Sequence, residues 1–201
     1  MRLWLVRHGQ TQANTQHLFC GRKESPLTQE GTAQARWVSQ QLQHVPFDLV
    51  MVSERERAQH TANLITCERH PDAIVSALLN EMDFGDWEMR HHSQLINEDP
   101  RYQAWCSDWQ HAVPPGGEGF PAFTARIANL AEMLRATPGE NVLLVTHQGV
   151  ISLLIAHLLN MPPAAMWSFA VEQGAWSRID LHGEQTTLRY LNNQGGSLPA
   201  H

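Results

Sequence analysis

Apolar residues gather in short runs along the chain, and such runs are typical of buried strands. Residues 2–6 and Asn141–Thr146 are the clearest, because most of their side chains are apolar. Similar but weaker runs predict further strands at residues 48–53, 74–78, 168–171, 176–181 and 186–191. We therefore expect a sheet that is assembled from strands far apart in the sequence.

Segments with helical periodicity lie between these runs. One follows Thr28, a predicted N-cap, and others cover residues 54–69, Phe120–Ala136 and 150–159. Alternation of strands and helices is typical of an α/β fold. The pattern predicts a three-layer, doubly wound, mostly parallel sheet with helices on both faces, in a single domain at residues 1–201.

The stretch at residues 83–115 breaks this alternation. It has no strand-like run, and it ends in Pro114-Pro115-Gly116-Gly117. Its aromatic residues are Phe84, Trp87, Tyr102, Trp105 and Trp109. Long insertions of this kind commonly serve a functional site. We expect a helical cap over the site, with some rings able to stack on a flat ligand.

Residues suited to phosphate chemistry follow the first predicted strand directly. Arg7 can donate to two phosphate oxygens at once, and His8 is a nucleophile that is largely neutral near pH 7. Gly9 allows the backbone to turn closely around a ligand. The tripeptide alone is not specific, because it also occurs by chance, so residues elsewhere in the chain must support it.

Other predicted strands end in similar chemistry. Arg57 begins the helix after the second strand, Glu81 follows the third, and His147 follows the strand at Asn141–Thr146. Ligands of open α/β sheets bind at the carboxyl ends of the strands. We therefore expect one site built from Arg7, His8, Arg57, Glu81 and His147.

Composition narrows the possible partners. The formal net charge is -6, and no run of Lys and Arg is present, which argues against a nucleic-acid partner. The three cysteines, Cys20, Cys67 and Cys106, lack metal-ligand or redox spacing and are expected to be free thiols. The longest apolar stretch, at residues 150–159, is too short to span a bilayer. We expect a cytoplasmic protein without a membrane partner.

Five motifs together resemble the histidine phosphatase superfamily, the phosphoglycerate mutase-like enzymes. They are LVRHGQTQAN, SPLTQEG, SERERAQHTA, NEMDFGDWE and VTHQG, in this order along essentially the whole chain. The chain departs from the usual family pattern at Gln10, Cys20, Met89 and Gly119. None of these departures removes a residue to which the resemblance gives a catalytic role.

The resemblance implies a role for each residue of the predicted site. His8 would be the phosphorylated nucleophile, and Glu81 would protonate the leaving group. The phosphoryl oxygens would be bound by Arg7, Arg57 and a protonated His147. Such a cationic pocket would need neither a metal ion nor another cofactor. Further substrate contacts are expected from Asn14, the backbone at Gly21, and Gln148.

Longer segments resemble the α-ribazole phosphatase branch: NEMDFGDWEMRHH, AWCSDWQHAVPPGGEGF and THQGVISLLIAHLLNMPPAAMW. This implies a small phosphate monoester as substrate, α-ribazole 5'-phosphate, in assembly of the cobalamin nucleotide loop. Residues 83–115 hold six acidic and two basic side chains, which would disfavour a second carboxylate on the substrate. The alternatives are a phosphoglycerate mutase, a broad-specificity small-molecule phosphatase and a non-catalytic phosphate-binding domain.

Overall fold

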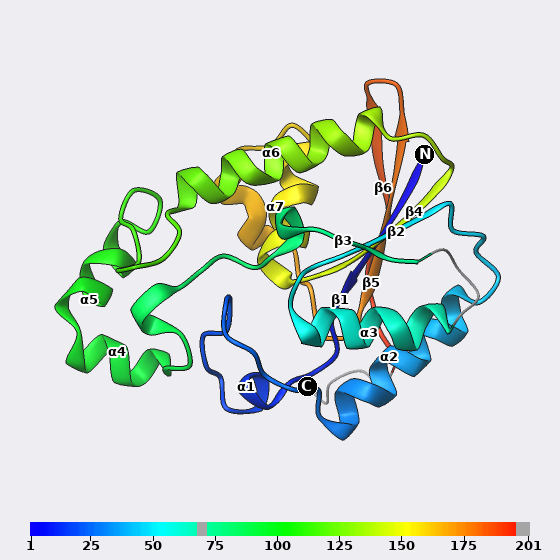
Figure 1. Ribbon diagram of the computed structural model, residues 1–201. Helices are drawn as coiled ribbons and strands as arrows, with labels where there is room; N and C mark the ends of the chain where they lie inside the picture. The colour runs from blue at the N-terminus through cyan, green and yellow to red at the C-terminus, as the bar shows by residue number, and fades with distance from the viewer. Residues whose placement is uncertain (68–71, 196–201) are drawn as a thin grey trace.

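A mixed sheet of six strands organises the computed structural model, which describes residues 1–67 and 72–195 (Figure 1). Across the sheet the strands are β3 (Ile74–Val75), β2 (Leu49–Val52), β4 (Asn141–Thr146), β1 (Arg2–Arg7), β5 (Trp176–His182) and β6 (Gln185–Asn193). The first four are parallel, while β5 and β6 are antiparallel to their neighbours. The predicted α/β class with a mostly parallel sheet is confirmed.

Helices cover both faces of this sheet, also as predicted (Figure 1). On one face lie α2 (Gln29–Leu42) and α3 (Glu56–Thr66). On the other lie α6 (Phe120–Ala136) and α7 (Gln148–Leu158). A short helix, α1 (Gln12–Thr15), follows the first strand. The three-layer arrangement therefore has α2 and α3 below the sheet and α6 and α7 above it, in the view of Figure 1.

The alternating side chains of β1 explain why both faces are covered. Trp4 and Val6 belong to the apolar cluster with α2 and α3, whereas Leu3 and Leu5 belong to the cluster with α6 and α7. Successive side chains of a strand point to opposite faces, so a strand that is apolar throughout needs cover on both sides. The first apolar run of the sequence thus requires a layer of helices on each face.

Two predicted strands differ from the observed structure. The run at residues 74–78 gives only the two-residue β3, because the Ser76 side chain accepts from Leu78 N–H and starts the 3-10 helix η1 (Ala77–Leu79). The strand predicted at residues 168–171 is wrong. Its first residue ends the 3-10 helix η3 (Pro163–Ser168), and the carbonyl of Val171 accepts from the Arg7 side chain instead of a strand neighbour.

The insertion at residues 83–115 is helical, as predicted, and lies beside the start of α6 (Figure 1). It contains the 3-10 helix η2 (Gly85–Trp87), α4 (His92–Glu98) and α5 (Pro100–Ser107). Trp87 and Tyr102 are buried inside it, and the Trp87 indole donates to Asp99. Two of the five predicted cap aromatics therefore form the insertion's own core.

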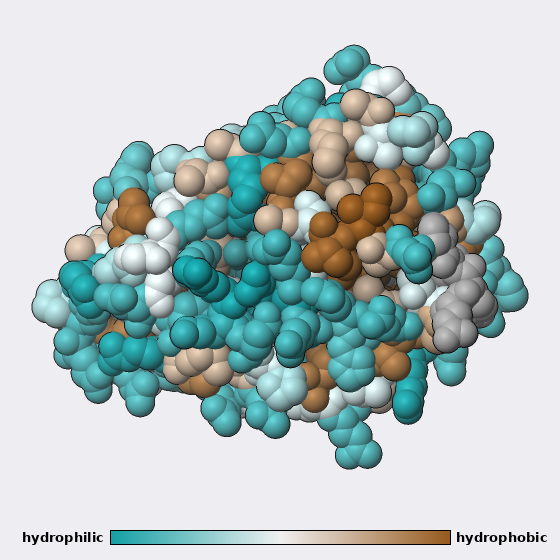
Figure 2. Space-filling model, in the orientation of Figure 1, coloured by the Kyte–Doolittle hydropathy of each residue, from teal (hydrophilic) through white to brown (hydrophobic). Residues whose placement is uncertain are grey.

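The surface is largely hydrophilic on the face shown in Figure 2. Its main apolar patch lies where Figure 1 draws β3, whose Ile74 and Val75 are about half exposed. Within the described ranges, every helix is too short or too polar to cross a bilayer. The three cysteines are free thiols, as predicted.

Candidate active site

The strand register brings the two predicted histidines together. Arg7 of β1 lies opposite Thr146 of the neighbouring parallel strand β4, and His8 and His147 are the next residue of each chain segment. Their ring centroids are 5.1 Å apart, and both side chains are buried. The carboxyl ends of two adjacent strands thus form the centre of the site, as the sequence predicts.

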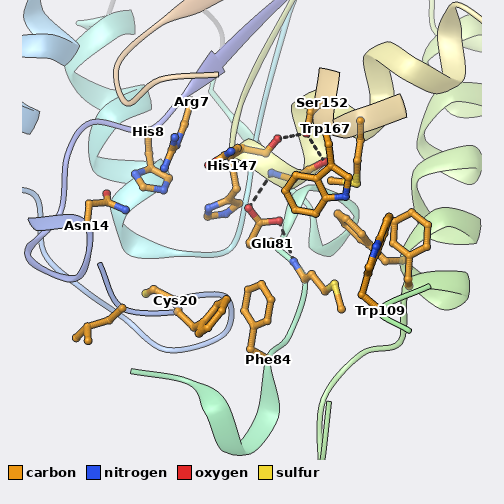
Figure 3. A pocket seen from close by; sticks show the side chains of 18 of the residues that line it. Arg7, His8, Asn14, Cys20, Glu81, Phe84, Trp109, His147, Ser152 and Trp167 are labelled. Atoms are coloured by element: carbon orange, nitrogen blue, oxygen red, sulfur yellow. Dashed lines mark hydrogen bonds between the residues drawn. The ribbon is translucent and has the colours of Figure 1, made fainter. Parts of the chain in front are cut away.

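His8 has a defined tautomer, because its Nδ1 lies 2.7 Å from the Gly9 carbonyl oxygen. A carbonyl only accepts, so Nδ1 carries the proton and Nε2 keeps its lone pair. Beside it, Arg7 donates from Nη1 to the Val171 carbonyl at 2.6 Å. The buried Arg7 Nε has no hydrogen-bond partner among the described residues. A nucleophilic nitrogen and an unused donor thus lie next to each other (Figure 3).

Glu81 is held by two backbone N–H groups. Its Oε1 accepts from Met82 at 3.0 Å, and its Oε2 accepts from Gly149 at 2.9 Å. Gly149 lies in the first turn of α7, where a Cβ atom would come within 2.4 Å of Glu81 Oε1. Only glycine allows this approach, which places the carboxylate between His147 and Trp167 (Figure 3).

Arg57 lies behind the cavity instead of lining it. Its buried guanidinium donates to the carbonyl groups of Cys20, Gly21 and Lys23 at 2.7–3.2 Å. A further contact of 3.7 Å joins its Nη1 to Glu24. Its charge nevertheless reaches both histidines, whose pKa values it lowers. Arg57 thus lies near the site, as the sequence predicts, but its donors bind a loop, and the expected contact with phosphoryl oxygens stays a prediction.

That loop is held from its other side by Glu88. The Glu88 carboxylate accepts backbone N–H groups from Gly21, Arg22, Lys23 and Phe84, at 2.9–3.1 Å. The N–H of Gly21, expected to face substrate, thus points at Glu88. Sequence reasoning did not single out Glu88, although it follows Trp87 inside one of the motifs that carry the family resemblance.

Asn14 and Gln148 both line the cavity that opens beside the two histidines. The Asn14 side-chain oxygen accepts from the N–H and the hydroxyl of Thr11, each at 3.0 Å. This orients the Asn14 amide nitrogen away from Thr11, and Figure 3 shows the side chain beside His8. Of the three expected additional contacts, the structure therefore brings two to the cavity, and it directs the N–H of Gly21 elsewhere.

Burial governs the charge of both histidines. It lowers the pKa of His8 well below its ordinary value, and the positive charges of Arg57 and Arg7 lower it further. His147 shows the same direction, with burial first and Arg57 next among the causes. Both imidazoles are thus neutral near pH 7. The protonated His147 expected during catalysis concerns the phosphate-bound site and stays a prediction, whereas the complete burial that keeps it neutral without ligand is not visible in the sequence.

The departures from the family pattern have local effects. Met89 stands where glycine is common and has a φ of 62°, a left-handed conformation that is unfavourable for a residue with a side chain. Gly119 is the N-cap of α6 and provides no side-chain cap, which a serine would. Gln10 accepts from the Thr28 hydroxyl, and Cys20 lines the cavity while its thiol donates to the Lys23 carbonyl.

A cavity of about 290 Å³ extends from the histidines toward the insertion. Its far end is lined by aromatic side chains, namely Phe84, Trp105, Trp109, Phe120 and Trp167. Trp167 comes from η3, outside the predicted cap, and contacts Trp109 edge to face at 5.7 Å between ring centroids. Figure 3 shows Trp109 and Trp167 on the opposite side of Glu81 from His8, and Phe84 below Glu81. The site therefore has a polar end and an aromatic end.

The acidic residues of the insertion do not line this cavity. Glu88 binds backbone N–H groups, and the other five lie close to basic side chains: Asp83 to Arg22, Asp86 and Asp99 to Arg101, Glu98 to Arg90, and Asp108 to His111. The expectation that they repel a second substrate carboxylate is therefore wrong. Across residues 1–67 and 72–195, no three His, Cys, Asp or Glu side chains are grouped as a metal ion would require.

Fold and site together define a phosphoryl-transfer enzyme that works through histidine. The chain belongs to the histidine phosphatase superfamily (branch 1), whose sequence profile matches residues 3–194. The resemblance inferred from the five motifs is thus confirmed.

Known relatives narrow the comparison. The adenosylcobalamin/alpha-ribazole phosphatase of Escherichia coli (strain K12) is 52% identical over 96% of this chain and 97% of that protein. The protein of the same name from Salmonella typhimurium is 53% identical with the same coverage. The crystal structure of the alpha-ribazole phosphatase from Shigella flexneri matches with a TM-score of 0.93 and 50% identity over the whole of both chains. The chain is thus similar, over nearly its whole length, to phosphatases that are named for alpha-ribazole.

Proposed function

We propose that this protein hydrolyses α-ribazole 5'-phosphate through a phosphohistidine formed on His8. The observation that carries the proposal is the two-ended cavity, which has Arg7, His8 and Glu81 near one end and aromatic rings at the other. A phosphate joined through a ribose to a flat heterocycle has the same two-ended character. Relatives about half identical to this chain are named for this substrate, which supports the choice.

The aromatic end suits a ring system better than a carboxylate. Stacking of a heterocycle on one aromatic side chain contributes roughly 1 to 3 kcal/mol, by analogy with nucleobases. Trp167 is 64% exposed, so its ring is accessible. Trp105 also lines the cavity, and its buried indole N–H has no partner within the described ranges. An oxygen or nitrogen of the substrate would satisfy this donor.

The first chemical step follows from the tautomer of His8. Its Nε2 attacks phosphorus while the bond from phosphorus to the ribose oxygen breaks. Glu81, protonated at this stage, gives its proton to the departing oxygen, since an alkoxide is a poor leaving group. The free donor of Arg7 binds a phosphoryl oxygen, and the charge of Arg57 stabilises the transition state from behind the loop. Asn14 and Gln148 provide further contacts.

The second step reverses the roles of these groups. A water molecule attacks the phosphohistidine, and Glu81, now ionised, takes one of its protons. The bond between phosphorus and His8 Nε2 breaks, which restores the neutral imidazole and releases inorganic phosphate. His147 binds the phosphoryl oxygens throughout. Neither step requires a metal ion or an organic cofactor, since arginine and imidazole groups provide the positive charge.

We place this activity in a single domain at residues 1–201, with residues 83–115 as a cap. We further propose a cytoplasmic location, to which the three free thiols are suited. The substrate would be a small phosphate monoester, and no membrane or nucleic-acid partner is expected.

A substrate comparison tests the proposal. Purified protein would be assayed for phosphate release from α-ribazole 5'-phosphate, adenosylcobalamin phosphate, 3-phosphoglycerate and p-nitrophenyl phosphate, without added metal and with a chelator present. We expect the highest kcat/KM for α-ribazole 5'-phosphate. Comparable turnover of 3-phosphoglycerate, or a requirement for a bisphosphate, would instead support a mutase. Equal rates on all four esters would support a broad-specificity phosphatase, and no turnover a binding domain.

Trp167→Ala separates ring recognition from chemistry. Since the residue is largely exposed, its loss should not disturb the fold. Stacking worth roughly 1 to 3 kcal/mol corresponds to about a 5- to 150-fold loss in kcat/KM for α-ribazole 5'-phosphate. The rate with p-nitrophenyl phosphate should change much less. The exposed Tyr190→Ala provides a matched control, because this ring packs on Trp176, away from the cavity.

A further inference from the structure

The hydrogen-bond partners of His147 determine which ring nitrogen carries its proton. Nε2 lies 2.8 Å from the Ser53 hydroxyl. Nδ1 is buried and has no hydrogen-bond partner in the described part of the chain. A serine hydroxyl can donate or accept, so this contact alone is compatible with both neutral tautomers. The other partners of Ser53 are needed to decide between them.

Ser53 gives its single proton to Asn80. The two are 2.8 Å apart, from Ser53 Oγ to Asn80 Oδ1. The identity of this amide oxygen is fixed by Glu54, whose backbone N–H donates to it at 3.0 Å. The Asn80 amide nitrogen in turn donates to the Glu54 carboxylate at 2.7 Å. If Ser53 turned its proton toward His147, two oxygen atoms would face each other at 2.8 Å with no proton between them.

Ser53 can therefore only accept from His147. Its oxygen has two acceptor positions, and the backbone N–H of Arg55 occupies the other at 3.2 Å. This leaves Nε2 of the neutral imidazole protonated and Nδ1 with a lone pair. A lone pair repels a phosphate oxygen, so Nδ1 must gain a proton before it can bind one.

We propose that Ser53 is a positioning residue that, together with Asn80, fixes neutral His147 as its Nε2–H tautomer, so that phosphate binding requires Nδ1 to take up a proton from solvent. The proposal rests on the proposed function only in that a phosphate group binds beside His147. It assigns to two residues outside the reacting set a role in the binding step, because they control which form of the imidazole meets the ligand.

The surrounding charges favour this sequence of events. In the ligand-free protein, the pKa of His147 is lowered first by burial and then by the positive charges of Arg57, Arg7 and Arg55, while the neighbouring His8 opposes a charge on both imidazoles at once. Glu81 is the acidic group of the cavity lining. A phosphate dianion bound among these cations would outweigh their repulsion and stabilise an imidazolium. The proton is therefore absent before binding and present afterwards.

Nitrogen NMR of the unaltered protein tests the tautomer directly. Side-chain ¹⁵N shifts distinguish a protonated ring nitrogen from one with a lone pair, and a His147→Gln spectrum assigns the signals. We expect Nε2–H and a bare Nδ1 near neutral pH without ligand. A neutral His147 protonated on Nδ1 would contradict the proposal, and this result would not depend on the substrate.

Calorimetry tests the proton uptake. Inorganic phosphate would be titrated, at a pH where it is dianionic, in two buffers of different ionisation enthalpy. His8→Ala would be the background, so that only His147 changes protonation among the paired histidines. We expect about one proton taken up per phosphate bound. In Ser53→Ala the ring can adopt the Nδ1–H tautomer, which donates without extra protonation, so uptake should fall toward zero.

Ser177→Ala is the matched control for loss of a buried hydroxyl. Ser177 lies on β5, where it accepts from the Asn192 N–H. Its removal should leave the proton uptake at about one. Equal uptake in Ser53→Ala and Ser177→Ala would overturn the proposal, as would the absence of uptake in the His8→Ala background. A wrong assignment of the alcohol part of the substrate would leave these results unchanged, because phosphate alone is the ligand.

Discussion

The two histidines of the site occupy equivalent places and have opposite hydrogen-bond arrangements. Each follows the last residue of a central parallel strand, and the strands are neighbours in register. At His8, Nδ1 is bound to the Gly9 carbonyl, so Nε2 is available. At His147, Nε2 is bound to Ser53, so Nδ1 is available. The same residue type at two equivalent strand ends thus presents different atoms to the cavity.

This difference shows that the partner of the second nitrogen determines what an imidazole can do. His8 Nδ1 donates to the carbonyl of the next residue, Gly9, which leaves Nε2 available to attack phosphorus. His147 is bound by the end of another strand, β2, and so depends on tertiary structure for its tautomer. We therefore assign attack to His8 and binding of phosphoryl oxygens to His147.

The largest effect should come from removing the nucleophile. His8→Ala is expected to lower kcat by about 10⁴-fold or more, because no other nucleophile lies at this position. Rapid quench with labelled substrate should trap an acid-labile, base-stable phosphoenzyme in the unaltered protein and none in the variant. Undiminished labelling of His8→Ala would exclude His8 as the phosphorylated residue.

Replacing Glu81 should have the next largest effect. Its carboxylate accepts from the N–H of Gly149, two residues after His147. Glu81→Gln cannot donate a proton and should slow hydrolysis of alkyl phosphates by roughly 10²- to 10⁴-fold. The loss should be much smaller with p-nitrophenyl phosphate, whose leaving group hardly needs a proton. Equal losses on both ester types, with phosphorylation rate-limiting, would remove Glu81 from the acid role.

His147→Ala should have a smaller effect than either change. Loss of one group that binds the transition-state oxygens typically costs about 10²- to 10³-fold. Phosphorylation should slow in His147→Ala, but the label should still appear on His8. In His8→Ala, by contrast, no label should appear. A variant in which labelling disappears altogether would show that the two histidines do not divide the work as assigned.

Lowering the pH should destabilise the folded protein through both histidines. Because their pKa values are lowered in the folded protein, the unfolded chain binds more protons once the pH falls below about 6.5. The free energy of unfolding should therefore fall by up to about 1.4 kcal/mol per pH unit for each histidine. Urea unfolding between pH 7.5 and about 5 measures this slope. His8→Asn and His147→Gln should each reduce it, and unchanged slopes would contradict neutral burial.

Much of this arrangement could be predicted from the sequence, since strand ends are local features. The runs at residues 2–6 and Asn141–Thr146 are apolar enough to require burial on both faces, which already places His8 and His147 at one edge. The bounds predicted for Phe120–Ala136 match α6 as observed. The long apolar runs and the clear helical periodicity were therefore reliable, whereas the short runs at residues 74–78 and 168–171 were not.

Features that depend on several distant segments were not accessible in this way. Trp167 lines the cavity from η3, directly before residues 168–171, for which the sequence predicts a strand. Asp83 of the cap pairs with Arg22 of a distant segment, and this cannot be read from the number of acidic residues. The neutral state of His147 requires complete burial, which its sequence neighbours do not reveal. Each of these depends on which segments meet in three dimensions.

The carboxylate of Glu88, held by four backbone N–H groups, means that the loop at residues 20–23 is pre-organised. In many phosphate sites the ligand itself orders such a loop, and part of the binding energy is lost to that ordering. Here the protein supplies its own anion, so the loop is ordered on folding. The loop therefore keeps the same shape in the empty and in the phosphate-bound site, and no binding energy is spent on ordering it.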